Sequence, residues 1–393
     1  MGKCGLMPNR EASNTRRTGN TRKRFLIPVL SVLLIVGLIE AVVVPLEILV
    51  PSEFRGRQTT LYGLFEPHAE RGFRTRANLR DFEITWMQNS LRASYSTDEL
   101  GFRNVGRDYD QSEIFFVGDS FTWGMWLPRE QTFPDLVGQR FGKVVSNLGQ
   151  QSYYIEQYEK ILRGLLGRYS PRYVALCIFA NDLTTPISDD DLANFYERFG
   201  WDQYREYPLY KKFFVYQASQ FIGQQWRRLA VATGLEPPPA PSHLDHETNQ
   251  AGMEFYRQLG AHPYYFTQSY DAGIEAVFGR LLVFVQESEV TPVVFLLPSK
   301  ESAYKQEYLK IFPGDYLEIE ETAYSRLCEI STELGVDCLD LTSAFRQASS
   351  NRDTYFKQDP HWNRDGQLVA ADEMMKYFHR EREESETEPG SRP

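Results

Sequence analysis

The chain has 393 residues, enough for two average domains or for one large domain with insertions. Hydrophobic residues make up 42% and aromatic residues 14%, which supports a sizeable core and excludes a disordered chain. The formal net charge of -10 argues against a nucleic-acid partner, because a general nucleic-acid binder needs a basic face.

The N-terminus joins a basic segment to an apolar one. Residues 1–24 are basic, and residues 25–46 are apolar except for Glu40. A stretch of about 20 apolar residues can cross a bilayer, and basic residues before it favour a cytoplasmic N-terminus. The sequence therefore predicts a transmembrane helix over 25–46. It also predicts a single-pass inner-membrane protein, with its catalytic domain in the periplasm or otherwise outside the cytoplasm. A cleaved signal peptide is the alternative.

Residues 51–110 form a lead-in segment with strand-like pieces such as 82–86. From residue 111 onwards, apolar runs of strand length alternate with stretches of helical spacing. Strands separated by helices predict a parallel sheet with crossover connections. The predicted strands are 114–117, 144–147, 173–179, 292–297 and 336–341. The predicted helices are 133–141, 155–166, 274–285, 322–334 and 366–378.

Two stretches depart from this alternation. Residues 184–265 combine an aromatic-rich helical stretch with a proline-rich loop, which is typical of an insertion or lid. Residues 380–393 are charged and contain Ser and Pro, which predicts a disordered tail. The fold class is therefore α/β. A three-layer α/β/α domain over 111–379 contains a five-stranded, mainly parallel sheet and the insertion 184–265.

The four cysteines fall in different settings. Cys4 lies in the basic segment predicted to be cytoplasmic, and Cys177 lies in an apolar strand as a core residue. Cys328 and Cys338 lie in a predicted helix and in the strand that follows it. They either form a disulfide in an exported domain or remain two core thiols. No Cys or His spacing suggests zinc, and neither a metal nor a cofactor is predicted.

Polar residues follow the first three predicted strands. The tripeptide Gly118-Asp119-Ser120 comes directly after the first strand, Gly149 follows the second, and Asn181 follows the third. Ligand sites of open α/β sheets lie at the carboxyl ends of their strands, so we expect these residues to meet. Ser120 supplies a nucleophilic hydroxyl. The Ser120 and Gly149 amides and the Asn181 side chain supply donors for an oxyanion.

A base and its acid partner come late in the chain. His361 lies between the last predicted strand and the last predicted helix, and Asp359 lies two residues before it. A carboxylate in that position can fix the tautomer and orientation of the imidazole. We therefore predict a triad of Ser120, His361 and Asp359.

These motifs together resemble the SGNH (GDSL) hydrolase superfamily. Its blocks are a Gly-Asp-Ser serine, a glycine after the second strand, an Asn in a Gly-x-Asn-Asp motif, and a late Asp/His pair. The resemblance covers roughly residues 112–180 and 290–378. It implies the SGNH hydrolase fold, a triad of Ser120, His361 and Asp359, and an oxyanion hole of Ser120, Gly149 and Asn181. Phe179 stands where the third block has Gly.

A second resemblance concerns the last block. The sequence from Asp359 to Trp362 is similar to the Asp-x-His-Trp of alginate-type O-acetyltransferases and of related membrane-anchored exopolysaccharide proteins. In the alginate-type enzymes this pair precedes the serine, whereas here it follows. The segment Pro298-Ser299-Lys300, with Tyr304, also resembles a Pro-x-Lys-x-x-x-Tyr element of such proteins.

The motifs predict a serine ester hydrolase or O-acyltransferase that forms an acyl-enzyme on Ser120. The predicted exported orientation favours an acylated envelope or secreted polysaccharide, or a small ester, as substrate, and an envelope biosynthesis complex as a partner. Two alternatives stay open. One is a non-catalytic SGNH-like protein that binds glycan or assembles a complex, and the other is a lipid esterase. The sequence does not choose between transfer to water and transfer to a sugar.

Overall fold

The computed structural model divides the chain into two units, residues 1–57 with 208–236 and residues 58–207 with 237–393. The first unit contributes the helical residues 30–38, and all other elements below belong to the second. The structure describes residues 28, 30–38, 63–85, 91–183, 188, 190, 192, 226, 273–310, 315–357 and 359–387.

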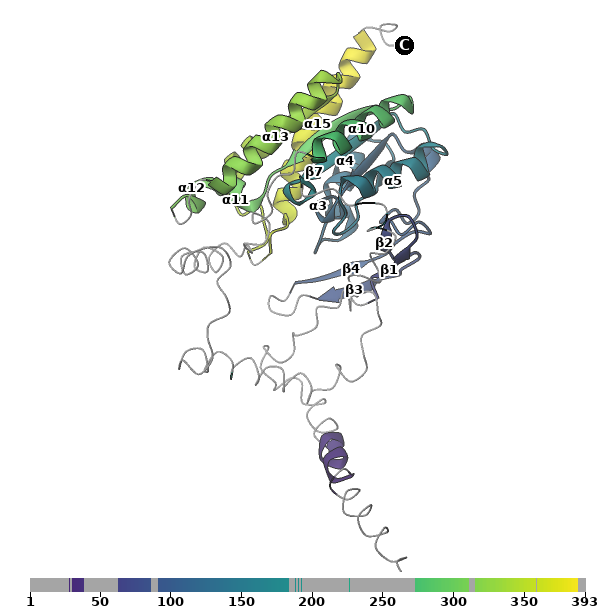
Figure 1. Cartoon of the computed structure of the whole chain (residues 1–393), viewed down its shortest axis with the longest axis vertical. Helices are drawn as coiled ribbons and strands as arrows, with labels where there is room; N and C mark the ends of the chain where they lie inside the picture. The colour runs from purple at the N-terminus through teal and green to yellow at the C-terminus, as the bar shows by residue number, and fades with distance from the viewer. Residues whose placement is uncertain are drawn as a thin grey trace, which may run out of the picture. The chain divides into compact units, whose positions relative to one another are not determined.

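A five-stranded parallel sheet forms the centre of the second unit (Figure 1). Its strand order is β6-β5-β7-β8-β9. All the strands point the same way, so their carboxyl ends lie at one edge, as the sequence predicts. The strands are β5 (Ile114–Gly118), β6 (Val145–Asn147), β7 (Tyr173–Phe179), β8 (Thr291–Leu297) and β9 (Asp337–Asp340).

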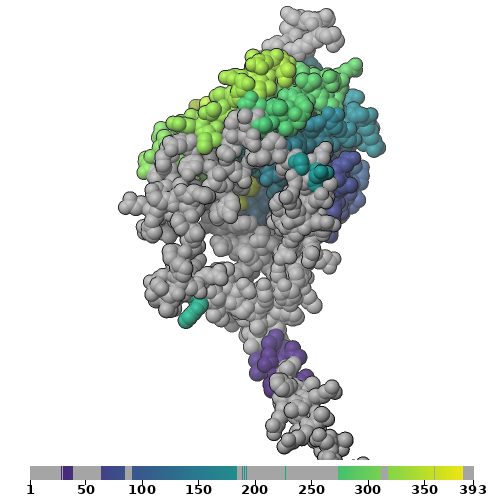
Figure 2. Space-filling model, in the orientation of Figure 1, coloured from purple at the N-terminus to yellow at the C-terminus, as the bar shows by residue number. Residues whose placement is uncertain are grey.

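Helices cover both faces of the sheet, which confirms the three-layer α/β/α prediction. Successive strand residues face opposite sides. Phe115 and Val117 pack in the core formed with α5, α10 and α13, whereas Phe116 packs in the core formed with α4, α14 and α15. Figure 2 shows the outer surfaces of α5, α10 and α13 next to one another. The bounds are α4 (Phe133–Phe141), α5 (Ile155–Leu166), α10 (Gly273–Glu287), α13 (Asp315–Glu333), α14 (Thr342–Ser349) and α15 (Arg364–Thr387).

Short helices occupy several connections near the strand ends. They are α3 (Ser120–Trp123), α11 (Lys300–Ala303), α12 (Lys305–Tyr308) and the 3-10 helices η2 (Tyr109–Gln111), η3 (Arg129–Gln131) and η4 (Ala180–Leu183).

The described part of the lead-in segment, residues 63–85 and 91–110, packs against the sheet and helices of the second unit. Its Phe73 and Tyr95 are fully buried in the same core as α5 and α10. Asn104 also exchanges two hydrogen bonds with the backbone of Asn147 at the end of β6, at 2.9 and 3.0 Å. The segment forms two antiparallel hairpins, β1 (Phe65–His68) with β2 (Gly72–Thr75), and β3 (Phe82–Thr85) with β4 (Arg92–Tyr95).

The C-terminal helix is longer than predicted. It continues to Thr387, so residues 380–387 are helical where the sequence predicts the start of a disordered tail. Glu and Arg, which are frequent in this stretch, are good helix formers. Glu381 is also buried at 5% exposure, so the helix is still in contact with the protein at this point.

The apolar N-terminal stretch departs from its prediction. Within residues 25–46 the structure describes residue 28 and residues 30–38, all helical. A helix needs about 20 apolar residues to cross a bilayer. None of the helices in the described part of the chain is both long and apolar enough to do so. The predicted transmembrane helix, and the single-pass inner-membrane localisation based on it, are therefore contradicted.

Two further predictions lie almost wholly outside the described residues. The basic segment 1–24, with Cys4, is not described at all, and of the insertion 184–265 the structure describes four positions.

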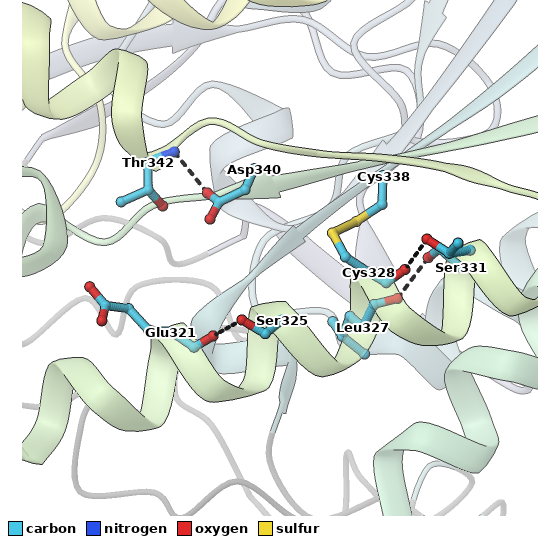
Figure 3. Close-up of a disulfide and its surroundings, with 9 residues drawn as sticks. Glu321, Ser325, Leu327, Cys328, Ser331, Cys338, Asp340 and Thr342 are labelled. Carbon is cyan, nitrogen blue, oxygen red and sulfur yellow. Dashed lines mark hydrogen bonds between the residues drawn. A yellow bond between two sulfur atoms is a disulfide. The ribbon is translucent and has the colours of Figure 1, made fainter.

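The structure decides the question that the sequence leaves open for the cysteines. Cys328 on α13 and Cys338 on β9 form a disulfide, drawn in Figure 3. The bridge ties a helix to the strand that follows it in the sequence. Cys177 remains a free, buried thiol on β7, in agreement with its prediction as a core residue.

Removing the disulfide should lower stability measurably. In the variant with Cys328→Ser and Cys338→Ser, we expect the free energy of unfolding to fall by about 3 kcal/mol, because a cross-link over a short loop restricts the unfolded chain. Urea unfolding with and without a reductant measures this difference. The reductant should lower the midpoint of the wild type and leave the double variant unchanged. Equal midpoints for both proteins would contradict the contribution of the bridge.

Candidate active site

The tripeptide Gly118-Asp119-Ser120 forms a tight turn between β5 and α3. A Cβ atom at Gly118 would lie 2.2 Å from Thr122 Oγ1 and 2.7 Å from the Cys177 carbonyl oxygen, so only glycine fits. Asp119 caps α3 by accepting a hydrogen bond from the Phe121 amide at 2.9 Å. Ser120 is therefore held as the first residue of α3, at the carboxyl end of β5.

The structure brings the three predicted triad residues into one hydrogen-bonded chain. Ser120 Oγ lies 2.8 Å from His361 Nε2, and His361 Nδ1 lies 2.6 Å from Asp359 Oδ1. The His361 backbone amide donates to the same Asp359 oxygen at 2.9 Å. This geometry allows the imidazole to accept the hydroxyl proton while the carboxylate holds the ring.

The electrostatics of the pair favour charge separation. Burial alone would lower the pKa of His361, but the charge and hydrogen bond of Asp359 outweigh it and raise that pKa. Burial would likewise raise the pKa of Asp359. The His361 ring and amide and the Trp126 indole together hold it below its usual value instead. The site therefore stabilises the imidazolium that forms when His361 takes a proton.

Two further carboxyl groups are buried near the triad: Asp119 next to Ser120, and Asp182, which interacts with Asp119. Burial raises the pKa of Asp119 to about 6, and its Oδ2 lies 3.4 Å from Ser120 Oγ. Burial and the charge of Asp119 also raise the pKa of Asp182. Asp182 accepts hydrogen bonds from the Phe179 amide and the Tyr158 hydroxyl, both at 2.9 Å. Asp182 therefore links the end of β7 to α5 through hydrogen bonds.

Gly149 lies next to α3, but its amide has another partner. The Gly149 N–H donates to Asn147 Oδ1 at 2.9 Å. A Cβ at this position would lie 2.3 Å from the Trp123 backbone nitrogen. The glycine is thus required for close packing, and its N–H is not presented as an unoccupied oxyanion donor.

Asn181 lies in η4, directly after β7, and is half-buried. Its side chain lies beside Asp119 and lowers the pKa of that carboxyl by hydrogen bonding. The Ser120 amide is the first of a helix, where backbone N–H groups lack intrahelical partners. Asn181 and Ser120 are therefore placed at the same strand edge as the triad.

A tryptophan outside the predicted motifs contacts the triad directly. The Trp126 indole Nε1 donates to Asp359 Oδ2 at 2.9 Å. Trp126 and Asp359 are 233 residues apart in the sequence, and no spacing rule links them. The only signal was the position of Trp126 shortly after the serine turn.

The Pro-x-Lys-x-x-x-Tyr element supports the loop that leads to Asp359. The buried Lys300 ammonium donates to the carbonyl oxygens of Phe356 at 2.6 Å and Lys357 at 3.3 Å. The Tyr304 hydroxyl accepts from the Thr354 amide at 3.2 Å. Burial lowers the pKa of Lys300 to about 8. The element after β8 thus anchors the backbone just before Asp359.

The C-terminal part of the chain matches a known protein family. Residues 274–392 match the family described as "SGNH hydrolase-like domain, acetyltransferase AlgX". The chain is similar to SGNH hydrolases and to AlgX. This match confirms both resemblances, and with the geometry it supports an SGNH-type ester hydrolase or O-acetyltransferase. The matched residues include Asp359 and His361, whereas Ser120 lies before them. No curated protein matches the chain.

Solved structures that are similar to this chain include esterases and G-D-S-L family proteins. A lipolytic G-D-S-L family protein from Veillonella parvula DSM 2008 has 10% identity and a TM-score of 0.38, covering 68% of this chain and 99% of its own. The acetyl xylan esterase AlAXEase has 13% identity and a TM-score of 0.35. The match covers 67% of this chain and 98% of the esterase. A catalytic mutant of the acetylxylan esterase Axe2 from Geobacillus stearothermophilus has 11% identity and a TM-score of 0.35. The match covers 67% of this chain and 93% of the esterase. At these identities and TM-scores, the similarities say nothing about what this chain acts on.

Proposed function

We propose that the protein cleaves an ester through an acyl-enzyme on Ser120 and passes the acyl group to water or to a sugar hydroxyl. The observation that carries the proposal is the hydrogen-bonded chain of Ser120, His361 and Asp359. The match of residues 274–392 to an acetyltransferase family supports acetyl as the acyl group. The resemblance to alginate-type enzymes supports an acetylated polysaccharide as the substrate class.

In the first half of the cycle, His361 Nε2 takes the proton of Ser120 Oγ as that oxygen bonds to the ester carbonyl carbon. The negative charge moves to the carbonyl oxygen, where the Ser120 amide and the Asn181 side chain are the donors. Gly149 joins them only if its N–H leaves Asn147. When the intermediate collapses, the bond to the leaving alkoxide breaks, and that oxygen takes the proton from His361.

In the second half, a hydroxyl group from water or from a sugar attacks the Ser120 ester. His361 takes its proton, and the collapse of the second intermediate breaks the bond to Ser120 Oγ, which regains a proton. Both outcomes use the same residues. The nature of the acceptor alone distinguishes a hydrolase from a transferase.

Mass spectrometry of the full chain tests the proposal. After incubation with p-nitrophenyl acetate, we expect an acetyl group on the peptide that contains Ser120. A fluorophosphonate should label the same residue if the acetyl-enzyme is short-lived. Adding an unacetylated oligosaccharide should produce an acetylated sugar if the protein is a transferase, and acetate alone if it is a hydrolase. Absence of turnover, adduct and label together would refute the acyl-enzyme.

A further inference from the structure

The loop after α3 holds Trp126 in an unusual backbone conformation. Trp126 has φ 65°, in the left-handed region that bulky residues rarely adopt. Its backbone N–H donates to the Tyr95 hydroxyl at 2.8 Å, and its side chain is 4% exposed. Strained conformations of this kind persist only where the surroundings fix them, and they concentrate at functional sites. Here the conformation presents the indole N–H to Asp359 Oδ2.

A buried arginine from the lead-in segment fixes this loop. The Arg103 guanidinium donates to the carbonyl oxygens of Trp123 at 2.7 Å, Gly124 at 3.0 Å and Leu127 at 2.8 Å. These carbonyls lie on both sides of Trp126 in the sequence. A planar guanidinium with several fixed donors can hold such a set, which a lysine cannot.

The guanidinium also lies between two aromatic rings. Arg103 Cζ lies 4.7 Å from the ring centroid of Tyr95 and 5.4 Å from that of Trp123. Arg103 is 2% exposed, so its charge is taken out of water. Burying a charge is costly, and a fold retains it where the contacts specify one arrangement. Here the contacts of Arg103 specify the conformation of the loop around Trp126.

We propose that Trp126 is a positioning residue for Asp359, and that Arg103 acts through Trp126. The inference rests on the proposed function, because it assigns two residues that orient the carboxylate of the same triad. Asp359 Oδ1 is occupied by His361, and Oδ2 is occupied by the indole. With both oxygens engaged, the carboxylate cannot rotate without breaking a hydrogen bond. The carboxylate in turn orients the His361 imidazole, so that its Nε2 stays hydrogen-bonded to Ser120 Oγ.

Replacing Trp126 with phenylalanine tests the contact, because it keeps an aromatic ring and removes the N–H. We expect Trp126→Phe to lower kcat for p-nitrophenyl acetate roughly 10- to 100-fold with little change in KM, since a hydrogen bond to a charged group is lost. The proton between His361 Nδ1 and Asp359 Oδ1 should move upfield in the NMR spectrum or disappear by exchange. An unchanged kcat with that resonance in its wild-type position would overturn the proposal.

Tyr324→Phe is the matched control. It removes one buried hydrogen bond, from the Tyr324 hydroxyl to the Leu297 carbonyl oxygen, and that bond involves neither Trp126 nor Asp359. We expect the control to keep the wild-type kcat and resonance even if it loses stability. If the control reproduces the effect of Trp126→Phe, general loosening explains both variants, and the proposal fails.

Arg103→Met then tests whether the arginine acts through the indole. We expect it to lower kcat in the same direction as Trp126→Phe. The double variant should be no worse than Trp126→Phe alone, because both changes disturb one contact. Additive losses would show that Arg103 acts by another route. If the wild type turns over no ester, the proposed function fails, and the NMR resonance still decides this inference.

Discussion

Replacing Ser120 with alanine should lower kcat for p-nitrophenyl acetate on the order of 10⁴-fold or more, because the acyl group then has no oxygen to bond to. The loss should appear in kcat, with folding intact, since Ser120 is only partly buried at the start of α3 and alanine is a good helix residue. Fluorophosphonate labelling should disappear in parallel.

A second serine on the surface provides the control for this loss. Ser325 lies exposed on α13, where its hydroxyl donates to the Glu321 carbonyl oxygen at 2.8 Å (Figure 3). Ser325→Ala should keep full turnover and full labelling. If Ser120→Ala retained turnover, the acyl-enzyme on Ser120 would be excluded.

Replacing Asp359 with asparagine should lower kcat by about as much, on the order of 10⁴-fold, with nearly the same side-chain volume. An asparagine amide donates to His361 Nδ1 and so favours the tautomer that carries its proton on Nε2. That nitrogen can then no longer accept the proton of Ser120.

The same substitution should shift the pH profile of the residual activity. The reaction needs neutral His361, so activity rises as the pH increases through the pKa of His361. Asp359 raises the pKa of His361 above its ordinary value in the wild type. Without the charge of Asp359, the pKa of His361 falls, so the acid limb of kcat/KM should move to lower pH.

Asp353→Asn is a suitable comparison, because Asp353 is an exposed residue of the same loop whose carboxylate lies 3.9 Å from Lys357 Nζ. It should leave both kcat and the acid limb in place. An acid limb that stays fixed in Asp359→Asn would mean that Asp359 does not set the pKa of His361.

The regular part of the fold could be predicted from the sequence because its signals are local. The apolar spacing of residues 133–141 and 155–166 gives the bounds of α4 and α5 as the structure has them. The alternation of strands and helices also fixes the edge at which Ser120 and His361 meet, since parallel strands align their carboxyl ends.

The supports of the site could not be predicted, because they depend on contacts between distant segments. Nothing near Arg103 in the sequence indicates that its guanidinium binds three carbonyls of a loop 20 or more residues away. The hydrogen bond from the Gly149 amide to Asn147 could not be predicted either, because it depends on the orientation of the Asn147 side chain. The extension of α15 was missed because a charged, polar stretch has the composition of a tail.

The lead-in hairpins extend the N-terminal boundary of the functional unit to residues before 111. By composition and periodicity, the hydrolase-like domain starts near residue 111, and a trimmed protein would be cut there. Such a cut would remove Arg103 from the Trp126 loop and Asn104 from the end of β6. It would also expose the apolar side chains that Phe73 and Tyr95 cover. The smallest piece that can keep an intact site therefore begins before Leu64, which is fully buried in that core.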